Sequence, residues 1–161
     1  MAKLVVVKGD QVTGTDKHKV QGFLPPPPAP PPAYAGIGSF KYQGSITDDL
    51  SDFVRIGGTP VALVTSRSSL DPGEDAPPAG RHSGPAGSEF TGPAPNPVTL
   101  SIVDAPLGAG VPGSGAGSGL LTVNGVKVLL DGDAIDTCGP APTTGGSKVA
   151  AQGQDFVTCS T

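Results

Sequence analysis

The apolar residues of this chain form short runs that are separated by Gly, Pro and small polar residues. Strand character, meaning β-branched or alternating apolar positions between turn residues, is found in residues 4–7, 39–46, 98–103 and 156–158. No segment has the stripe of a helix, in which apolar residues recur about every 3.6 positions, and residues 47–52 suffice for one turn at most. The pattern predicts an all-β chain with little or no helix.

Two further segments have the pattern of a β-hairpin. Two apolar runs flank Gly57-Gly58, and two more flank Asn124-Gly125. Gly and Asn tolerate the positive φ that tight hairpin turns need. When Gly58 is placed on Gly125, an offset of 67 residues, four apolar positions coincide: Val54, Ile56, Val61 and Leu63 fall on Leu121, Val123, Val128 and Leu130. We therefore predict an internal repeat of one supersecondary unit.

Three Pro/Gly-rich inserts lie between these segments, at about residues 24–36, 71–97 and 106–119. Residues 25–32 contain seven prolines in eight positions, and such a run adopts the stiff polyproline II conformation. Composition of this kind predicts loops, which we expect to wrap a narrow β core or to cover a partner surface. The whole chain, residues 1–161, is expected to form a single domain.

The composition limits what the core can be. Of the 161 residues, 25 are Gly and 19 are Pro, only 4% are aromatic and none is Trp. This Gly and Pro content is in the range of disordered chains, but 36% of the residues are hydrophobic and they are concentrated in β-branched runs. A folded chain with so thin a core usually needs a staple or a partner.

Charge and the N-terminus limit the partners and the compartment. The formal net charge of −4 argues against nucleic acid and against an anionic membrane surface as partners. No apolar run approaches the roughly 18–20 residues that span a bilayer, and the N-terminus lacks the apolar core and cleavage site of a signal peptide. We expect synthesis in the cytoplasm, with any export by another route. A reducing cytosol disfavours a disulfide between Cys138 and Cys159 during folding.

Turn, strand and acidic motifs follow one another in a recurring order. The residues concerned are Gly9-Asp10 followed by His18, Gly57-Gly58 followed by Pro60 and Ala62, and Asn124-Gly125 followed by Gly132-Asp133 and Cys138. In order and in kind, these motifs resemble the PAAR and PAAR-like spike-tip proteins of bacterial contractile injection systems. In that family an Asn-Gly or Gly-Gly turn leads into a Pro-Ala-Ala-Arg-type strand, then Gly-Asp, then a Cys or His.

The resemblance implies a short-stranded, tapered β-prism with pseudo-threefold symmetry. Its base would sit on the trimeric β-helix of a VgrG-like spike protein, with one cap per trimer, and its apex would carry a metal ion. The protein would sharpen the spike of a type VI secretion system, an extracellular injection particle or a phage-tail-like particle for piercing a target envelope. As a structural protein, it would meet the target membrane transiently and leave the cell when the machine fires or is released, with effectors as further partners.

The family's use of His and Cys as metal ligands makes all such residues of this chain candidates: His18, His82, Cys138 and Cys159. Two His and two Cys fit a closed tetrahedral site of the kind that holds structural zinc, with iron as the alternative. One shared ion would pin four distant segments together and supply the staple that the thin core lacks. Other roles stay open: a solvated loop residue for either histidine, and a disulfide or two buried thiols for the cysteines.

Nothing in the sequence favours catalysis. The Gly-rich segment 113–119 lacks the Lys-Ser/Thr of a phosphate-binding loop, and no Gly-x-Ser-x-Gly elbow accompanies the serines. The acidic groups at 48–52 and 131–133 lack the EF-hand pattern, and we expect a protein that is not an enzyme. Three alternatives stay open: a proline-rich interaction module built on residues 25–32, an exported disulfide-bonded surface protein, and a small hydrolase or toxin fused to a tip.

Overall fold

The computed structural model describes residues 1–23, 33–70, 82–83, 89–90, 99–102, 109–137 and 147–160, with side chains at 1–14, 42–69, 110–137 and 147–160. These residues form strands, tight turns and irregular connections, and they contain no helix. The predicted all-β class is therefore confirmed. In the same residues, no helix is long and apolar enough to cross a membrane.

Six antiparallel strands form the body of the molecule, in the order β13, β10, β6, β3, β2 and β14. Their bounds are β2 Gln11–Phe23, β3 Ala33–Asp48, β6 Arg67–Leu70, β10 Ala109–Pro112, β13 Ile135–Asp136 and β14 Lys148–Ala150. The two ends of this order meet, since Ala134 and Lys148 form an antiparallel bridge and the Ile135 N–H donates to the Ser147 carbonyl at 3.0 Å. The sheet is therefore a nearly closed barrel.

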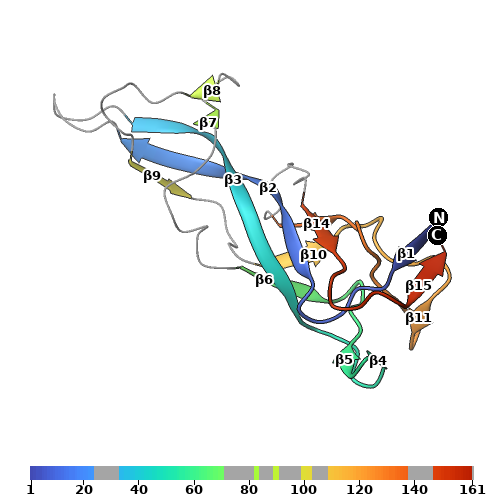
Figure 1. Cartoon of the computed structure of the whole chain (residues 1–161). Helices are drawn as coiled ribbons and strands as arrows, with labels where there is room; N and C mark the ends of the chain where they lie inside the picture. Colours follow the sequence, from blue (N-terminus) through green and yellow to red (C-terminus); the bar gives the residue numbers. More distant parts are fainter. Residues whose placement is uncertain are drawn as a thin grey trace.

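Two of these strands, β2 and β3, are much longer than their neighbours. They stay paired from Gln11↔Ser45 to Phe23↔Ala33, and they project from the barrel as a long hairpin (Figure 1). The short strands that attach to this long hairpin are β7 (His82–Ser83) on β3, β8 (Glu89–Phe90) on β7, and β9 (Thr99–Ile102) on β2. The long hairpin and the short strands attached to it therefore extend the barrel at one end.

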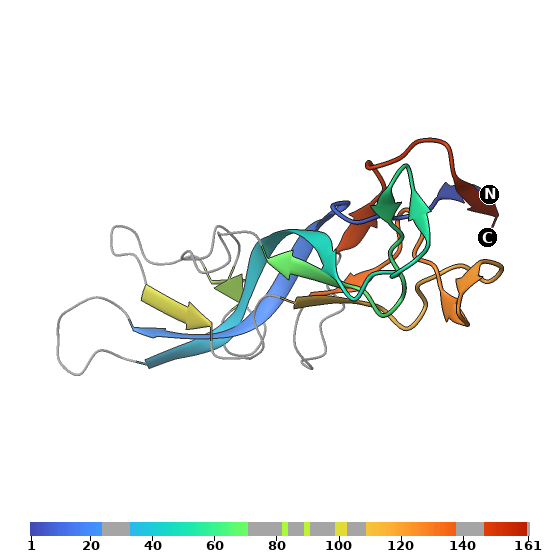
Figure 2. The ribbon, with the colours of Figure 1, turned by 90° about the horizontal axis from the view of Figure 1, so that it is seen from below.

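The barrel consists of three units, each with two adjoining strands that are joined at the same end by a projecting hairpin, which we call the arm. In the middle unit, β3 and β6 are joined through an arm made of β4 (Arg55–Ile56) and β5 (Thr59–Pro60). In the last unit, β10 and β13 are joined through β11 (Thr122–Val123) and β12 (Val126–Lys127). In the split unit, β14 leads into β15 (Thr158–Ser160), and β1 (Ala2–Leu4) pairs with β15 and leads into β2. Figure 2 shows the three arms together at the end opposite the long hairpin.

The turns of two arms match the prediction from the sequence. Gly57 and Gly58 have φ values of 57° and 86°, and Asn124 and Gly125 have φ values of 51° and 79°. Two successive residues with positive φ form the turn whose twist suits a two-residue hairpin. The predicted repeat, with its offset of 67 residues, is confirmed as the arms of the middle and last units.

A ring of backbone hydrogen bonds lies where the three units meet. After each arm, the chain crosses the interior through a residue with no exposed surface: Val6, Ala62 or Leu129. The N–H of Val6 donates to the Leu129 carbonyl at 3.0 Å, that of Leu129 to the Ala62 carbonyl at 3.0 Å, and that of Ala62 to the Val6 carbonyl at 2.9 Å. Each unit thus donates to one neighbour and accepts from the other, which confirms the expected pseudo-threefold symmetry.

Two hydrophobic clusters lie on either side of this ring. The barrel cluster consists of Val6, Val12, Tyr42, Ile46, Ala62, Ala116, Leu129, Ile135 and Val149. The arm cluster consists of Val5, Val7, Val61, Leu63, Val123, Val128 and Leu130. Successive side chains of an extended segment point to opposite faces. Each crossing segment, namely 5–7, 61–63 or 128–130, therefore contributes its central residue to the barrel cluster and the two neighbours of that residue to the arm cluster.

All three predicted loops contain strand, since residues 82–83 and 89–90 of the second one form β7 and β8. Residues 33–36 belong to β3 and residues 109–112 form β10, so the loop prediction is wrong at these positions. The reason is visible at Gly110, where an added Cβ would overlap the Ser68 Oγ and lie 2.8 Å from the Ile135 Cγ2. Gly here permits close packing between strands. The predicted polyproline run at 25–32 lies outside the described residues.

The split unit predicts that the chain tolerates circular permutation. Because β1 and β15 pair as far as Ala2↔Ser160, an Asn-Gly link in place of the two end residues would complete a third arm turn. With new ends between Asn124 and Gly125, we expect the permuted chain to fold with a thermal midpoint within about 5 °C of the original. Melting followed by circular dichroism would measure this.

A second permutant provides the control. If the new ends lie between Ala62 and Leu63, the cut falls inside the buried ring, and the chain should not unfold as one cooperative transition. Equal stability of the two permutants, or collapse of the first, would contradict the equivalence of the three units.

Candidate functional site

The three arms and the turns that follow them form one end of the molecule, which we call the three-arm end. It comprises residues 51–66, residues 118–133 and, from the split unit, residues 154–160 together with 2–10. Both chain ends lie in it, on the side away from the long hairpin (Figures 1 and 2). One chain therefore presents three related surfaces around a single axis.

The turn after each crossing segment is closed by the same kind of contact. Asp10 and Asp133 each accept, through Oδ2, the N–H of the residue three positions earlier, at 2.8 and 2.9 Å. In the middle unit the Ser66 Oγ accepts the N–H of Leu63 at 2.9 Å. Short polar side chains commonly bond nearby backbone groups in turns. The Gly-Asp motifs that stand out in the sequence are thus turn-closing motifs.

These turn residues also hold the beginning of each arm. The Asp10 Oδ1 accepts the N–H groups of Gln152 and Gly153 at 2.8 and 2.7 Å, so that this carboxylate, which is 1% exposed, connects the first and last segments of the chain. Ser66 makes the reverse contact, since its Oγ donates to the Asp49 carbonyl at 2.8 Å. A carboxylate accepts from N–H groups, whereas a hydroxyl can donate to a carbonyl. The aspartate and the serine therefore hold the beginning of their arms in the same way, with hydrogen bonds of opposite direction.

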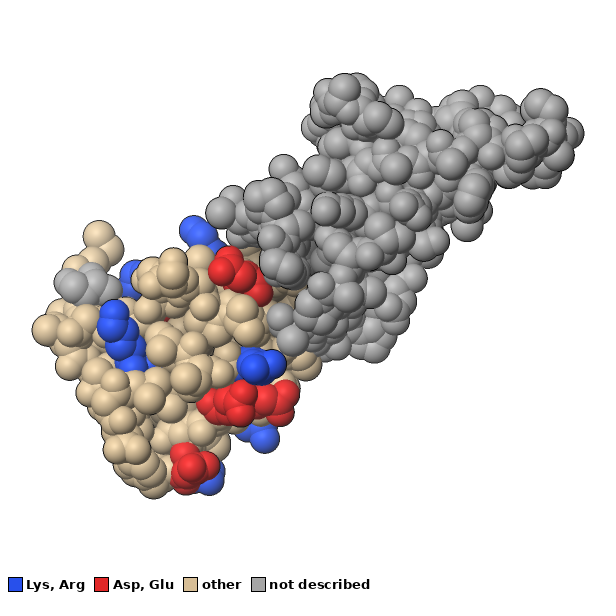
Figure 3. Space-filling model, turned by 180° about the vertical axis from the view of Figure 1, so that it is seen from behind, with Lys and Arg blue, Asp and Glu red and all other residues tan. Residues whose placement is uncertain are grey.

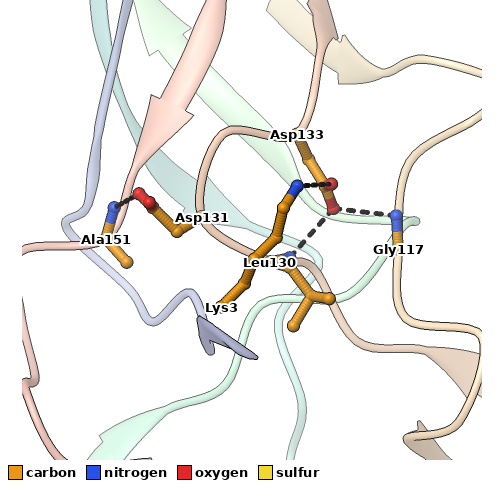
Figure 4. A network of polar contacts seen from close by, with 6 residues as sticks. All are labelled: Lys3, Gly117, Leu130, Asp131, Asp133 and Ala151. Carbon is orange, nitrogen blue, oxygen red and sulfur yellow. Dashed lines mark hydrogen bonds and ion pairs between the residues drawn. The ribbon is translucent and has the colours of Figure 1, made fainter. Parts of the chain in front are cut away.

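Asp133 has the corresponding role in the last unit (Figure 4). Its Oδ2 accepts the N–H of Gly117 at 2.8 Å, and its Oδ1 lies 4.0 Å from the Lys3 Nζ. Asp131, two residues earlier, accepts the N–H of Ala151 at 2.8 Å. Because Lys3 and Ala151 belong to the split unit, this network joins the last unit to the split unit. The acids at 131 and 133 serve in this structure as acceptors for backbone N–H groups.

The first residue of each arm is equivalent in the three units as well. The N–H groups of Ser51 and Ser118 donate to carbonyls of the crossing segments at 2.9 and 2.8 Å. In the split unit a side chain makes this contact, because the Gln154 Nε2 donates to the Val5 carbonyl at 2.8 Å while its Oε1 accepts the Val157 N–H at 2.7 Å. Gln154 thereby stabilises the one arm that no covalent turn closes.

Each arm exposes one large apolar side chain at the same position, two residues after the first residue of the arm. These side chains are Phe53, Leu120 and Phe156, with exposed fractions of 69%, 74% and 67%, and we call them the apolar triad. Leu121 of the last arm and Met1, which precedes β1, are exposed as well. Large apolar side chains that gather on a surface mark interaction sites, so the three-arm end is the candidate functional surface.

Charged side chains are distributed without this regularity. In the face that Figure 3 shows, Lys and Arg lie among Asp and Glu over the described part of the chain, and neither sign forms a continuous area. The described residues also include an exposed pair of Arg67 and Asp49, whose Nε and Oδ2 are 3.2 Å apart. Exposed pairs of this kind contribute little to stability. This face offers a partner a mixed charge pattern.

The structure places the four predicted metal ligands in different regions. His18 of β2 and His82 of β7 both pair with Gly38 of β3, from its two sides, so the two backbone positions are about 10 Å apart, or two strand spacings. Cys138 lies outside the described residues. Cys159 lies in β15, at the end away from β7 (Figure 1). The strand register thus brings the two histidines to the same residue of β3, whereas Cys159 lies far from them. Among the described residues, no group of three or more His, Cys, Asp or Glu side chains is placed to hold an ion.

Cys159 has instead a packing position that the sequence pattern does not reveal. Its pairing partner across the arm is Lys3, and the same place in the other two arms is taken by Ile56 and Val123. All three residues belong to the arm cluster or pack against it, and the Cys159 Sγ lies 3.1 Å from the Ser118 Oγ. A half-buried free Cys behaves as a small hydrophobic residue with a weak S–H donor. Metal binding by the four residues stays a prediction.

The sequence does carry a signal for the split unit, although the repeat with an offset of 67 residues contains only the other two. Residues 155–157 read Asp-Phe-Val, as do residues 52–54, and residues 5–10 follow the pattern of residues 128–133 with the same final Gly-Asp. The two halves of this unit lie at opposite ends of the chain. A repeat search at one fixed offset therefore does not join them.

Comparisons of the chain with protein-family models, with curated proteins and with solved structures find no match. The fold and the geometry of the three-arm end are therefore the basis for a functional proposal.

Proposed function

We propose that this protein is a structural tip that caps a trimeric spike of a contractile injection machine. The observation that supports this most is the ring through Val6, Ala62 and Leu129, because it relates three units of one chain by a pseudo-threefold axis. A cyclic homotrimer repeats one surface three times around its own axis. A single chain that does the same can make a similar contact with every subunit. The motifs that resemble the PAAR family support the same proposal.

The two ends of the molecule suggest its orientation on such a spike. The three-arm end repeats its structure three times, whereas the long hairpin, which connects β2 of the split unit to β3 of the middle unit, has no counterpart of its length among the described residues that connect β6 to β10 and β13 to β14. In the proposed assembly, the three-arm end faces the trimer and the long hairpin points away from it, toward the target envelope.

The proposed task also needs a body that transmits force without opening locally. Local opening is favoured where backbone hydrogen bonds are exposed and apolar contacts are few. Here the ring bonds join residues with no exposed surface, and the barrel order returns to its first strand. Both features favour unfolding as one unit, which suits a piercing element.

A test of the cap is binding to the trimeric β-helix of a VgrG-like spike protein from the organism that encodes this chain. The expected result is a complex with one copy of this protein for each trimer, measured by light scattering after size exclusion, and density on the trimer axis in electron microscopy. A chain that stays monomeric in the presence of that trimer at micromolar concentrations would refute the proposal.

We also propose a structural metal ion, zinc or iron, toward the long hairpin. His18 and His82 suit this role because their strands place them on either side of Gly38, with Cys138 as a further ligand; Cys159 does not fit it. A bound ion would cross-link β2 and β7 across β3. Elemental analysis should find about one ion per chain, which Cys138→Ser loses and the matched variant Cys159→Val keeps. Metal-free protein, or equal loss in both variants, would contradict this assignment.

A further inference from the structure

The apolar triad is an unusual surface for a chain with so few large apolar side chains. Only 4% of the residues are aromatic, yet Phe53 and Phe156 are each about two-thirds exposed, and Leu120 is exposed to a similar degree. In the middle and split units the next residue of the arm is turned inward, since Val54 and Val157 pack against the arm cluster. Phe53 and Phe156 therefore point away from this core, and Leu120 is exposed to the same degree. Exposure of this kind is costly in water and therefore indicates a partner.

The symmetry of the triad restricts what that partner is. Each member follows the first residue of its arm by two positions, and those first residues, Ser51, Ser118 and Gln154, donate to equivalent carbonyls. The three side chains therefore occupy equivalent positions around the pseudo-threefold axis. A partner with one copy of a complementary pocket would use one member and leave two exposed. A partner with three pockets around an axis would use all three.

We propose that the apolar triad is the contact surface that docks the three-arm end on a homotrimer, with Phe53, Leu120 and Phe156 each entering a pocket of a different subunit. The proposal rests on the proposed function and assigns its contact residues. Nothing about the long hairpin or the metal enters into it.

The area of the triad suits this role. A large apolar side chain buries about 150–250 Å² when fully covered, so three side chains that are about two-thirds exposed offer on the order of 400 Å². A standard interface buries about 800 Å² on each partner. The triad would thus supply about half of such an interface. A few large side chains usually dominate an interface.

The test compares three proteins in binding to the recombinant trimeric β-helix of the VgrG-like spike. These are the wild type, a variant with Phe53→Ser, Leu120→Ser and Phe156→Ser together, and the control Val111→Ser. Val111 is also exposed and apolar, at 40%, but lies in β10 of the barrel. We expect the triple variant to bind more than about 100-fold more weakly and the control to bind like the wild type. Circular dichroism melting should show that all three are equally folded, because the changed side chains are exposed.

The single variants make the test sharper. If each triad member meets one subunit, Phe53→Ser, Leu120→Ser and Phe156→Ser should each weaken binding by factors that agree within about threefold. Loss confined to one of them would overturn the threefold assignment. Undiminished binding by the folded triple variant would overturn the inference while the proposed cap remains.

Two other outcomes separate this inference from the proposed function. A wild type that does not bind the trimer would refute the cap itself. If sedimentation then shows that the wild type self-associates and that the triple variant does not, the triad is a contact between copies of this chain, and the inference is overturned as well.

Discussion

Gly44→Ala should lower the free energy of unfolding by more than about 3 kcal/mol, a shift of the thermal midpoint by roughly 6–12 °C for a chain of this size. Gly44 is buried in β3, and a Cβ at this position would overlap the carbonyl oxygen of Ser69 and lie 2.9 Å from the Tyr42 hydroxyl oxygen. The carbonyl belongs to the backbone of the neighbouring strand β6, so no side-chain rotation relieves the overlap. The strands of the narrow barrel would have to separate.

The matched control is Gly115→Ala. This Gly is exposed in the last unit, a Cβ added to it would have no other atom within 4 Å, and its φ is not in the left-handed region. We expect its stability to change by less than about 0.5 kcal/mol. Denaturant titration of both variants would measure the difference. Similar midpoints for the two would mean that close strand packing at Gly44 is not needed for the barrel.

Asp10→Ala should cost about 3 kcal/mol of unfolding free energy, because it removes a buried carboxylate that accepts three backbone N–H groups. Those groups belong to Val7, Gln152 and Gly153, at 2.7–2.8 Å. The substitution would leave the N–H of the first unpaired in the core and would release the segment that precedes β15 from the turn that precedes β2. We therefore expect the split unit to lose more stability than the other two.

Two measurements check this prediction. Thermal unfolding of Asp10→Ala should be compared with that of Asp155→Ala, which removes an exposed carboxylate from the same unit and should stay within about 0.5 kcal/mol of the wild type. Hydrogen exchange should then show the greatest loss of protection in β1 and β15. Equal stability of the two variants, or uniform loss of protection over the three units, would contradict the role assigned to Asp10.

Features that depend on neighbouring residues could be predicted from the sequence. Gly57-Gly58 and Asn124-Gly125 form the predicted turns because the positive φ of a tight hairpin is a property of two adjacent residues. The repeat was predictable for the same reason, since each copy is one continuous segment. The all-β class followed from short apolar runs without a helical stripe.

Features that depend on distant residues could not be predicted in this way. The split unit joins Ala2 to Ser160, so its two halves lie at opposite ends of the chain and form no continuous repeat. The strand at 109–112 has the composition of a loop, and it is extended because its neighbours β6 and β13 pair with it. The candidate functional surface is of the same kind, because the triad becomes a set of three only when the units close around an axis.

The metal-ligand prediction illustrates the difference at single residues. An inventory of His and Cys cannot tell which of them come close together. The register of β2, β3 and β7 brings His18 and His82 to the same Gly, whereas packing places Cys159 with Ile56 and Val123.

By itself, the sequence determined the class of fold, two of the arm turns and the relation between the middle and last units, because these follow from torsional preferences and side-chain patterns over a few residues. Only the tertiary structure decided that a third unit exists, that its halves come from opposite ends of the chain, and that three exposed side chains share one axis. Backbone pairing between segments more than a hundred residues apart produces these features, and such pairing is decided by the closure of the whole barrel.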